Sequence, residues 1–344
     1  MQSSLVSFNS NPSGYVYKNG DVTCNYDQYG SYVPGPYKTP NVFYNDDAWF
    51  NLEDVNQRLV GDCGFGAAMM ALRDVNSFSL KTFYTQINSA TLIANFRVNG
   101  KAVSVNMDAK LPTLNGATST YGRCLIPIGS FQIVNHNAYV PMAEKAFAKL
   151  LDAYPALRSS SGADKAGYEA LTGVRSFVVM RAITGKAGVR VNHNSIGTSH
   201  SYFDQTFANQ VITCLNAEFP CTIATPSHSG LANIYQLSDN TGYTNKAAAN
   251  INFVDDFITF NDVDQGGKAI RVVSNHWYTL LKSKSPHVHP DTANANPNQV
   301  LVTIRNPWGY NPTFSDPEVA GSAEVQVSLR ALYAIMSEIN TLRD

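Results

Sequence analysis

Cys63 is the residue of this sequence that is best placed to act as a nucleophile. It follows Gly61-Asp62 and precedes an apolar pattern with steps of three and four residues, which predicts a helix that begins at the cysteine. That pattern consists of Phe65, Ala68, Met69, Leu72 and Val75. Asp62 is expected to cap the helix, and the helix N-terminus favours the thiolate form of Cys63. An isolated cysteine is more often a small buried side chain, so Cys63 has to be judged together with other residues.

Three further residues complete a candidate catalytic set. Gln57 lies on the loop that enters the helix, where its amide can donate to an oxyanion beside the backbone N–H of Cys63. His276 opens an apolar stretch, and one ring nitrogen can accept the thiol proton while the other donates. Asn306 follows the apolar residues 300–304, and its amide oxygen can fix the tautomer of His276. A solvated glutamine, a core histidine and a turn asparagine are the ordinary structural alternatives.

The elements that must position these residues indicate an α+β protein. Besides the helix at Cys63, helices are predicted at 138–151, 168–172 and 205–219. Strands are predicted at 176–180, 220–225, 276–281 and 300–304. Residues 230–268 are rich in Asn and Gly and are expected to form long loops.

This order of elements predicts a mainly helical first half and a β-rich second half, with a cleft between two lobes. Residues 1–42 are rich in Tyr, Asn, Gly, Ser and Pro and predict an irregular N-terminal extension, which is a propeptide, an exosite or a wrapping arm. The expected organisation is therefore an extension at 1–42, a helical lobe with Cys63 at 43–173, and a β-rich lobe with His276 and Asn306 at 174–344.

Composition excludes several classes of partner. The net charge is −1 and no long basic run is present, so no nucleic-acid partner is expected. No apolar stretch is long enough to span a membrane, and the first residues lack the pattern of a signal peptide, so we expect a cytoplasmic protein. The five cysteines are odd in number and fit neither a disulfide framework nor a zinc site. His287 and His289 form an H-x-H pair without a cysteine or carboxylate cluster nearby, so no metal site is expected there.

Five segments resemble the calpain family of cysteine proteases, in the expected order, and the resemblance runs from about residue 43 to the end. The segment from Gln57 to Cys63 is similar to the family's cysteine motif, with the same spacing. His276-Trp-Tyr278 resembles the histidine motif, and Ile304-Arg-Asn-Pro-Trp-Gly309 matches the asparagine motif closely. Two further segments that resemble calpains are 141–149 and 168–173.

The resemblance implies a papain-like two-lobe cysteine protease fold and a cysteine-type endopeptidase, a hydrolase that cleaves a protein or peptide substrate through a thioester. Cys63 is then the nucleophile, His276 the general base, Asn306 the residue that orients the histidine, and Gln57 an oxyanion donor. Two alternatives remain open: a catalytically silent binding module with the same fold, and an acyl-transfer or deamidating enzyme that uses the same residues.

The sequence also departs from the calpain pattern. Gly64 stands where calpains have an aromatic residue, usually Trp, and Asn275 stands where they have Gly before the histidine. Gly173-Val174 replaces a pair of glycines, and the stretch 310–316 is shorter and lacks two tryptophans. Gly64 and Asn275 favour the silent alternative, whereas the intact Cys63, His276 and Asn306 favour catalysis.

Calcium is the one cofactor that the resemblance raises. Asp54 and Asp316 match one ligand each of the two calcium sites in the calpain core, and Glu144 is a candidate partner for Asp54. The remaining ligands cannot be matched, and a calcium ion takes six or more oxygen ligands. We therefore expect no cofactor and activity that depends on calcium weakly or not at all.

Overall fold

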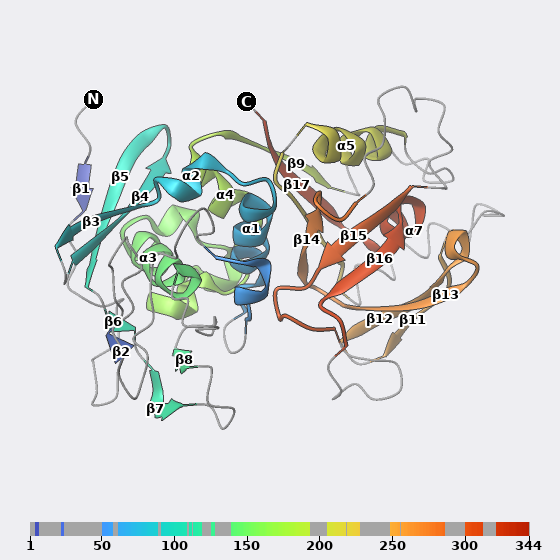
Figure 1. The fold of residues 1–344 in the computed structure, drawn as a ribbon, viewed down its shortest axis with the longest axis horizontal. Coiled ribbons are helices and arrows are strands. Elements are labelled where there is room, and N and C mark those ends of the chain that lie inside the picture. The colour runs from blue at the N-terminus through green and yellow to red at the C-terminus, as the bar shows by residue number, and fades with distance from the viewer. Residues whose placement is uncertain are drawn as a thin grey trace. The chain divides into compact units, whose positions relative to one another are not determined.

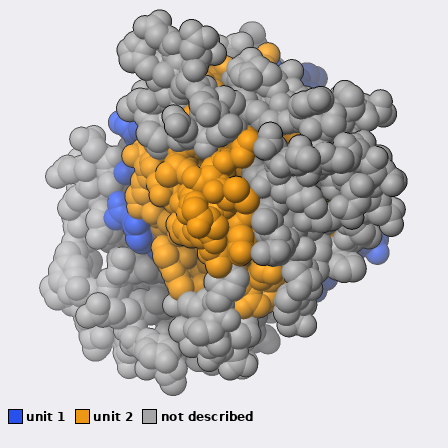
Figure 2. Space-filling view, turned by 90° about the vertical axis from the view of Figure 1, so that its right-hand side faces the viewer, with its two compact units in different colours: residues 1–187 blue, residues 188–344 orange. Residues whose placement is uncertain are grey.

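The computed structural model describes about two thirds of the chain and divides it into two compact units (Figure 1). Unit 1 spans residues 1–187 and unit 2 spans residues 188–344 (Figure 2). The described residues are 4–6, 22–23, 50–57, 61–88, 91–108, 110–111, 113–118, 125–127, 139–192, 205–217, 219–227, 248–254, 256–285, 300–311 and 321–343.

Unit 1 combines a four-stranded sheet with helices. The sheet has the strand order β1-β5-β4-β3, and its strands are β1 (Ser4–Val6), β3 (Tyr84–Asn88), β4 (Thr91–Val98) and β5 (Lys101–Asp108). Two smaller pairs are β2 (Val22–Thr23) with β6 (Lys110–Leu111) and β7 (Thr113–Thr118) with β8 (Leu125–Pro127). The helices are α1 (Cys63–Asp74), α2 (Phe78–Lys81), α3 (Tyr139–Ala153) and α4 (Ser176–Thr184), with 3₁₀ turns η1 (Leu52–Asp54), η2 (Pro155–Leu157), η3 (Ser160–Gly162) and η4 (Gly167–Leu171).

The sheet of unit 1 corrects the prediction of a mainly helical first half. Burial alternates along β4 and β5, so one face of this antiparallel hairpin is buried under α3 and α4. Asn99 and Gly100 join the two strands, both with positive φ (50° and 76°), as a two-residue hairpin turn requires. This alternation and the Asn-Gly pair are both sequence signals of a β-hairpin.

A chain of aromatic rings holds α1 against the rest of unit 1. Phe65 of α1 contacts Phe147 of α3, with ring centroids 5.8 Å apart, and Phe147 contacts Phe96 of β4 at 5.9 Å. The Tyr139 hydroxyl donates to the carbonyl of Leu80 at 2.7 Å, which connects α3 to α2. Because these side chains are buried, the first turn of α1 is fixed by packing as well as by its backbone bonds.

The strand predicted at 176–180 is wrong, because these residues begin the helix α4. The β-branched and aromatic residues in Ser176-Phe-Val-Val-Met180 favour a strand locally, but the pattern continues to Ile183 with helical spacing. Gly185 then ends the helix with a left-handed C-cap at φ 75°. Since α4 packs on α1 and β4, the structure divides the chain after Ala187 rather than after Gly173.

Unit 2 is built on a six-stranded sheet with the strand order β16-β15-β14-β10-β17-β9. These strands are β9 (Ala187–Asn192), β10 (Cys221–Ala224), β14 (Trp277–Leu281), β15 (Leu301–Arg305), β16 (Glu324–Ser328) and β17 (Glu338–Arg343). The helices are α5 (Gln205–Asn216) and α7 (Leu329–Ile335). The predicted helix at 205–219 and the predicted strands at 220–225, 276–281 and 300–304 are confirmed, as are the helices at Cys63 and at 138–151. The helix predicted at 168–172 is the 3₁₀ turn η4.

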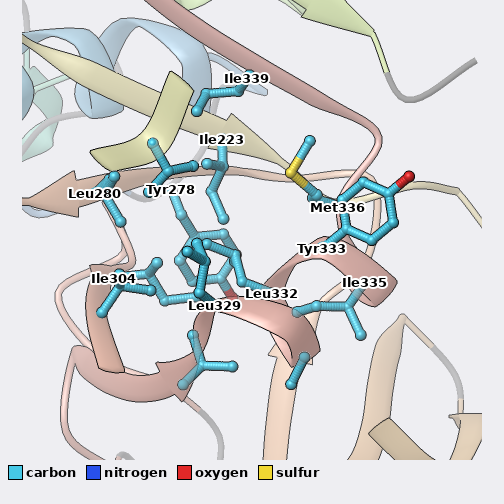
Figure 3. Close-up of a cluster of buried hydrophobic side chains, with 14 of the residues drawn as sticks. Ile223, Tyr278, Leu280, Ile304, Leu329, Leu332, Tyr333, Ile335, Met336 and Ile339 are labelled. Carbon is cyan, nitrogen blue, oxygen red and sulfur yellow. The ribbon is translucent and has the colours of Figure 1, made fainter. Parts of the chain in front are cut away.

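The core of unit 2 is a continuous cluster of buried hydrophobic side chains from the six-stranded sheet, α5 and α7 (Figure 3). Strands β10 and β14 are buried along their whole length, so both of their faces pack against other elements. Figure 3 shows Tyr278 among the aliphatic side chains of the cluster, between Ile223 and Ile304. The strands on which the candidate His276 and Asn306 depend are therefore rigid elements of the core.

The prediction of long loops at 230–268 is also wrong for the residues of this segment that the structure describes. Residues 248–273 form a three-stranded antiparallel sheet, made of β11 (Ala248–Val254), β12 (Phe257–Asp262) and β13 (Lys268–Val273), with the 3₁₀ turn η6 (Val263–Gln265) between the last two. Ile258, Phe260, Ile270 and Val272 belong to the core of unit 2. The Asn- and Gly-rich composition of the segment obscured two alternating strand patterns, which tertiary burial supports.

Asp262 connects this smaller sheet to α7. Its buried carboxylate accepts hydrogen bonds from the backbone N–H (2.7 Å) and the hydroxyl (2.8 Å) of Ser328, the N-cap of α7. Arg330 adds a two-bond ion pair to Asp264, at 2.9 and 2.6 Å. The smaller sheet is therefore part of the structural frame of unit 2. Both units mix helices and sheets, so the chain is α+β, as predicted.

Two short strands of the N-terminal extension join unit 1. β1 pairs in parallel with β5, with Ser4 opposite Val103, and β2 pairs with β6, with Val22 opposite Leu111. β1 is an edge strand of the four-stranded sheet. The extension thus adds strands to unit 1, which an irregular composition does not predict.

Candidate active site

Cys63 is the first residue of α1 and is nearly buried, with 9% of its surface exposed. The N–H groups of Phe65 and Gly66 donate to the carbonyl of Asp62 at 2.8 and 3.3 Å, which closes the first turn directly after the cysteine. The thiol therefore lies at the positive end of a helix of three turns, where an anion is stabilised.

Asp62 occupies the N-cap position, but its side chain makes no capping hydrogen bond, which corrects the prediction for that side chain. Its carboxylate instead accepts a hydrogen bond from the amide nitrogen of Gln57 at 3.0 Å, and both residues are buried. A buried carboxylate prefers a donor side chain, and Gln57 supplies one from the entering loop. This hydrogen bond fixes the orientation of the Gln57 amide beside Asp62, the residue that directly precedes Cys63. The amide nitrogen also carries a second hydrogen.

The two departures from the calpain pattern in unit 1 lie in contact with each other. A Cβ atom on residue 64 would meet the carbonyl oxygen of Val174 at 1.9 Å, so only glycine fits at this position. The backbone N–H of Gly173 donates to the carbonyl of Gly61 at 2.7 Å, which holds the two segments together. Gly64 thus allows the backbone at 172–174 to lie directly against the first turn of α1.

His276 and Asn306 form a buried hydrogen-bonded pair in unit 2. The Nε2 atom of His276 lies 2.9 Å from Oδ1 of Asn306, and His276 is 5% exposed. His276 directly precedes β14, and Asn306 directly follows β15, which is the antiparallel neighbour of β14. Adjacent ends of two paired strands therefore bring together two residues that are distant in the sequence.

The backbone around His276 is held by Thr225, which directly follows β10. The Thr225 hydroxyl accepts from the N–H of His276 at 3.0 Å, and the Thr225 N–H donates to the His276 carbonyl at 2.8 Å. Asn275 has a positive φ of 48°, a conformation that asparagine adopts more readily than most residues. The replacement of Gly by Asn at this position is therefore compatible with the geometry of the histidine motif.

Two aromatic rings surround the imidazole. The ring centroids of Trp308 and Tyr278 lie 4.9 and 5.3 Å from that of His276, both with edge-to-face geometry. Burial lowers the pKa of His276 from 6.5 to about 4, although the hydrogen bond with Asn306 acts in the opposite direction. The imidazole is therefore neutral at pH 7 in this environment and can accept a proton.

Asn311 is a buried residue of this site that the sequence interpretation missed. Its side-chain oxygen lies 3.1 Å from Nδ2 of Asn306 and 3.3 Å from the Tyr278 hydroxyl. It is followed by Pro312, as Asn306 is by Pro307, but Asn-Pro pairs also occur at 11–12 and 296–297, so this sequence signal does not single it out. An Asn-Pro pair usually marks a turn, so the contact with Asn306 is visible only in the folded chain.

Other candidates from the sequence are less informative. Cys214 and Cys221 are buried, and burial together with a hydrogen bond to Cys214 raises the pKa of the Cys221 thiol. Cys24, Cys124, His287 and His289 lie outside the described residues.

The candidate calcium ligands are only partly described. Asp54 is buried in η1, and one of its carboxylate oxygens accepts from the N–H of Asn51 at 2.7 Å. Glu144 is buried in α3, and Asp316 lies outside the described residues. In the part of the chain that the structure describes, no three His, Cys, Asp or Glu side chains are grouped so that they could hold a metal ion.

Comparison with known proteins places the chain in one family. None of the described helices is long and apolar enough to cross a membrane, and no curated protein matches the chain, so the assignment rests on a family model. A family model for calpain family cysteine proteases matches residues 36–321, which is well over half of the chain and includes the four candidate residues Gln57, Cys63, His276 and Asn306. The chain therefore belongs to the calpain family of cysteine proteases.

Proposed function

We propose that this protein is a cysteine endopeptidase with a papain-like two-lobe fold, which cleaves peptide bonds through Cys63, His276 and Asn306. The observation that carries the proposal is the buried hydrogen bond between His276 Nε2 and Asn306 Oδ1. A neutral, oriented imidazole is the general base that a cysteine nucleophile needs. The position of Cys63 at the start of α1 supports its role as the nucleophile.

The proposed reaction has two stages. In the first stage the sulfur of Cys63 attacks the peptide carbonyl carbon, and His276 takes the thiol proton. The C–N bond then breaks, His276 gives the proton to the leaving amine, and an acyl thioester remains. In the second stage water attacks the thioester with His276 as base, which releases the acid and restores the thiol.

Gln57 is proposed as a donor to the oxyanion of both stages, together with the backbone N–H of Cys63. Its bond to Asp62 uses one hydrogen of the amide nitrogen and orients the other. The negative charge of Asp62 works against an anion nearby, and the N-terminus of α1 offsets this effect.

The proposal includes protein or peptide substrates and activity that needs little or no calcium. Asp54 and Glu144 are candidates for one calcium site and Asp316 for the other, so the candidates for either site supply fewer than the six or more oxygen ligands that calcium takes. The carboxylate of Asp54 is also engaged with the backbone of Asn51.

The deciding experiment is labelling with a peptide epoxide, followed by mass mapping of the modified residue. The proposal predicts one modified cysteine, Cys63, and slower labelling in His276→Ala. Cys214→Ala and Cys221→Ala are matched controls that should label at the wild-type rate, because neither thiol lies at the N-terminus of a helix. Labelling spread over several cysteines at one slow rate would contradict the proposal.

A second measurement separates the endopeptidase from the two alternatives. The well-folded protein should hydrolyse an unstructured protein substrate, and Cys63→Ala should abolish this hydrolysis with an unchanged melting temperature to within a few degrees. Full activity in Cys63→Ala contradicts the proposed nucleophile. Labelling of Cys63 without any hydrolysis, or with release of ammonia from glutamine side chains, would favour the silent module or the deamidating enzyme.

The reaction also requires that His276 can reach Cys63. The short bifunctional reagent 1,3-dibromoacetone should join the two residues in solution, because it alkylates a thiol and an imidazole that lie within a few ångströms. Mass mapping of a Cys63–His276 bridge is the expected result, and only single alkylation of Cys63 would contradict the proposed pair.

A further inference from the structure

Asn311 lies at the centre of a hydrogen-bond network behind Asn306. It is 4% exposed, and its amide oxygen accepts from Asn306 Nδ2 (3.1 Å) and from the Tyr278 hydroxyl (3.3 Å). Its amide nitrogen donates to the backbone carbonyls of Ser322 (2.8 Å) and Ala323 (2.9 Å). The side chain therefore uses both its acceptor and its donor groups in directions that other residues determine.

Backbone groups fix the direction of every hydrogen bond in this network. The carbonyls of Ser322 and Ala323 can only accept, so the nitrogen of Asn311 must face them and its oxygen must face Asn306. At the other end, the backbone N–H of Val273 can only donate, and it does so to the Tyr278 oxygen at 2.8 Å. The hydroxyl proton of Tyr278 is therefore available for the oxygen of Asn311.

The same logic fixes the amide of Asn306. Because Asn311 presents an oxygen, Asn306 must direct its nitrogen there and its own oxygen to the opposite side. That oxygen accepts from the N–H of Trp308 and faces Nε2 of His276, both at 2.9 Å. An amide oxygen cannot donate, so Nε2 carries the proton of the neutral imidazole and the lone pair is on Nδ1.

Tyr278 makes the network rigid. Its ring is fully buried among the side chains of the unit 2 core, as Figure 3 shows, and it belongs to β14, the strand that His276 directly precedes. A ring in a close-packed core keeps its hydroxyl in one place. The fixed hydroxyl of Tyr278 thus constrains the side chain of Asn311, which orients Asn306 and, through it, the imidazole of His276.

We propose that Asn311 is a positioning residue that fixes the side-chain amide of Asn306 and thereby keeps His276 in the Nε2-protonated tautomer. Asn311 acts through Asn306 and takes no part in bond making. The inference rests on the proposed function in one respect, namely that Nδ1 of His276 is the nitrogen that accepts the proton of Cys63.

Two variants of Asn311 separate positioning from simple structural support. Asn311→Leu and Asn311→Asp both keep the branching and the number of heavy atoms of the asparagine side chain, and both lose the donor to Ser322 and Ala323. The ionised aspartate keeps an acceptor for Asn306 Nδ2, whereas leucine removes it. A purely structural role predicts that the two variants behave alike.

The direct readout is the ¹⁵N NMR spectrum of the full-length protein labelled at histidine, in which His276→Gln identifies the His276 signals. The wild type and Asn311→Asp should show the Nε2-protonated tautomer, and Asn311→Leu should show a mixture of tautomers. The added carboxylate of Asn311→Asp should also raise the pKa of the His276 imidazolium above the wild-type value. This readout requires no hydrolysis, so it decides the inference even if the proposed function fails.

Kinetics provide the second readout. Asn311→Leu should lower kcat about tenfold, which corresponds to about 1.4 kcal/mol for one lost buried hydrogen bond, and KM should change less than about threefold. Ser285→Ala is the control, because it removes a buried hydroxyl that bridges Leu281 and Thr303 and has no bond to the network. It should lower the melting temperature and leave both kcat and the His276 tautomer unchanged.

Two NMR results for the Asn311 variants would overturn the inference. One is a folded Asn311→Leu with wild-type ring-nitrogen shifts of His276, and the other is the same mixture of tautomers in the leucine and aspartate variants. If Asn311→Leu does not fold, Asn311→Asp decides alone. The Nε2-protonated tautomer with a raised imidazolium pKa supports the inference, and any other spectrum overturns it.

Discussion

The carbonyl oxygen of Val174 lies 1.9 Å from the point that a Cβ atom on residue 64 would occupy. Gly64 directly follows Cys63, so this backbone contact lies at the first turn of the helix that carries the candidate nucleophile. The bond from the Gly173 N–H to the Gly61 carbonyl holds the same two segments together. The backbone at residue 174 thus occupies the space that a side chain on residue 64 would fill.

Gly64→Ala should therefore destabilise unit 1 and slow the labelling of Cys63. The Val174 carbonyl is backbone and cannot turn away, so overpacking should cost about 1–3 kcal/mol. This cost exceeds the gain of up to about 1 kcal/mol that alanine brings inside a helix. The measurement is the free energy of unfolding in urea, together with the rate of epoxide labelling.

Gly61→Ala is the control for this prediction. A Cβ atom on residue 61 would meet only a methyl group of Thr172 at 3.4 Å, which is an ordinary contact. Its free energy of unfolding should stay within about 0.5 kcal/mol of the wild type. Equal stability of Gly64→Ala and Gly61→Ala would show that the Val174 contact is unimportant.

Asn306→Ala should lower turnover at least about tenfold and leave labelling of Cys63 partly intact. The variant removes the acceptor for His276 Nε2, which is worth about 1–2 kcal/mol in a buried site, but it leaves the thiol and the helix N-terminus unchanged. Turnover and labelling rates are compared in the same preparations. Thr303 lies on β15, the strand that Asn306 follows, and its hydroxyl donates to the Lys284 carbonyl. Thr303→Val removes this hydrogen bond and controls for loss of stability. An unchanged turnover in Asn306→Ala would mean that the residue serves only the turn after β15.

The stability of the fold should decrease as the pH falls from about 6.5 to about 4, in part through His276. Above pH 6.5 the imidazole is neutral in the folded and the unfolded chain, so it contributes nothing to pH dependence. Between these values the unfolded chain binds a proton that the buried imidazole does not, because burial lowers the pKa of His276 to about 4. The expected loss is about 3 kcal/mol in the free energy of unfolding.

His276→Gln tests this effect, since glutamine is similar in size and does not titrate. Urea unfolding at intervals from pH 7.5 to pH 4 should show a shallower decline for the variant than for the wild type. Parallel declines for the two proteins would mean that His276 is not buried as a neutral group.

Hydrolysis should proceed at the same rate in a chelator and in millimolar calcium, to within about twofold. The physical reason is that Asp54 is engaged with the backbone of Asn51, and that among the described residues no three His, Cys, Asp or Glu side chains are grouped so that they could hold a metal ion. A calcium titration of the melting temperature is the second measurement, because an ion that binds only the folded chain raises it. A steep gain in both rate and melting temperature would restore control by calcium.

Local sequence signals are sufficient for several elements of the fold. The apolar periodicity after Cys63 and at 138–151 predicts α1 and α3, and the apolar runs at 276–281 and 300–304 predict β14 and β15. These segments combine a clear pattern with a strong propensity for the same structure, so tertiary contacts have nothing to override.

Other segments depend on what packs against them. Residues 176–184 include β-branched side chains but form α4. The helical conformation is favoured because it buries the apolar side chains of one face against α1 and β4. Residues 248–273 have a loop-like composition but form a sheet whose inward side chains complete the core of unit 2. Intrinsic propensity amounts to less than about 1 kcal/mol per residue, so burial of a single side chain can outweigh it.

The amino-acid sequence is sufficient to identify the candidate catalytic residues, because a cysteine at a helix start and the motifs around His276 and Asn306 are local patterns. How these residues are held depends on contacts that form only in the folded chain. Gln57 is bonded to Asp62, Val174 lies against Gly64, and Asn311 lies behind Asn306. The Val174 and Asn311 contacts depend on turns and strand pairing. Even the short contact between Gln57 and Asp62 needs the burial that the rest of the fold provides, because a polar pair becomes obligatory only when water is excluded.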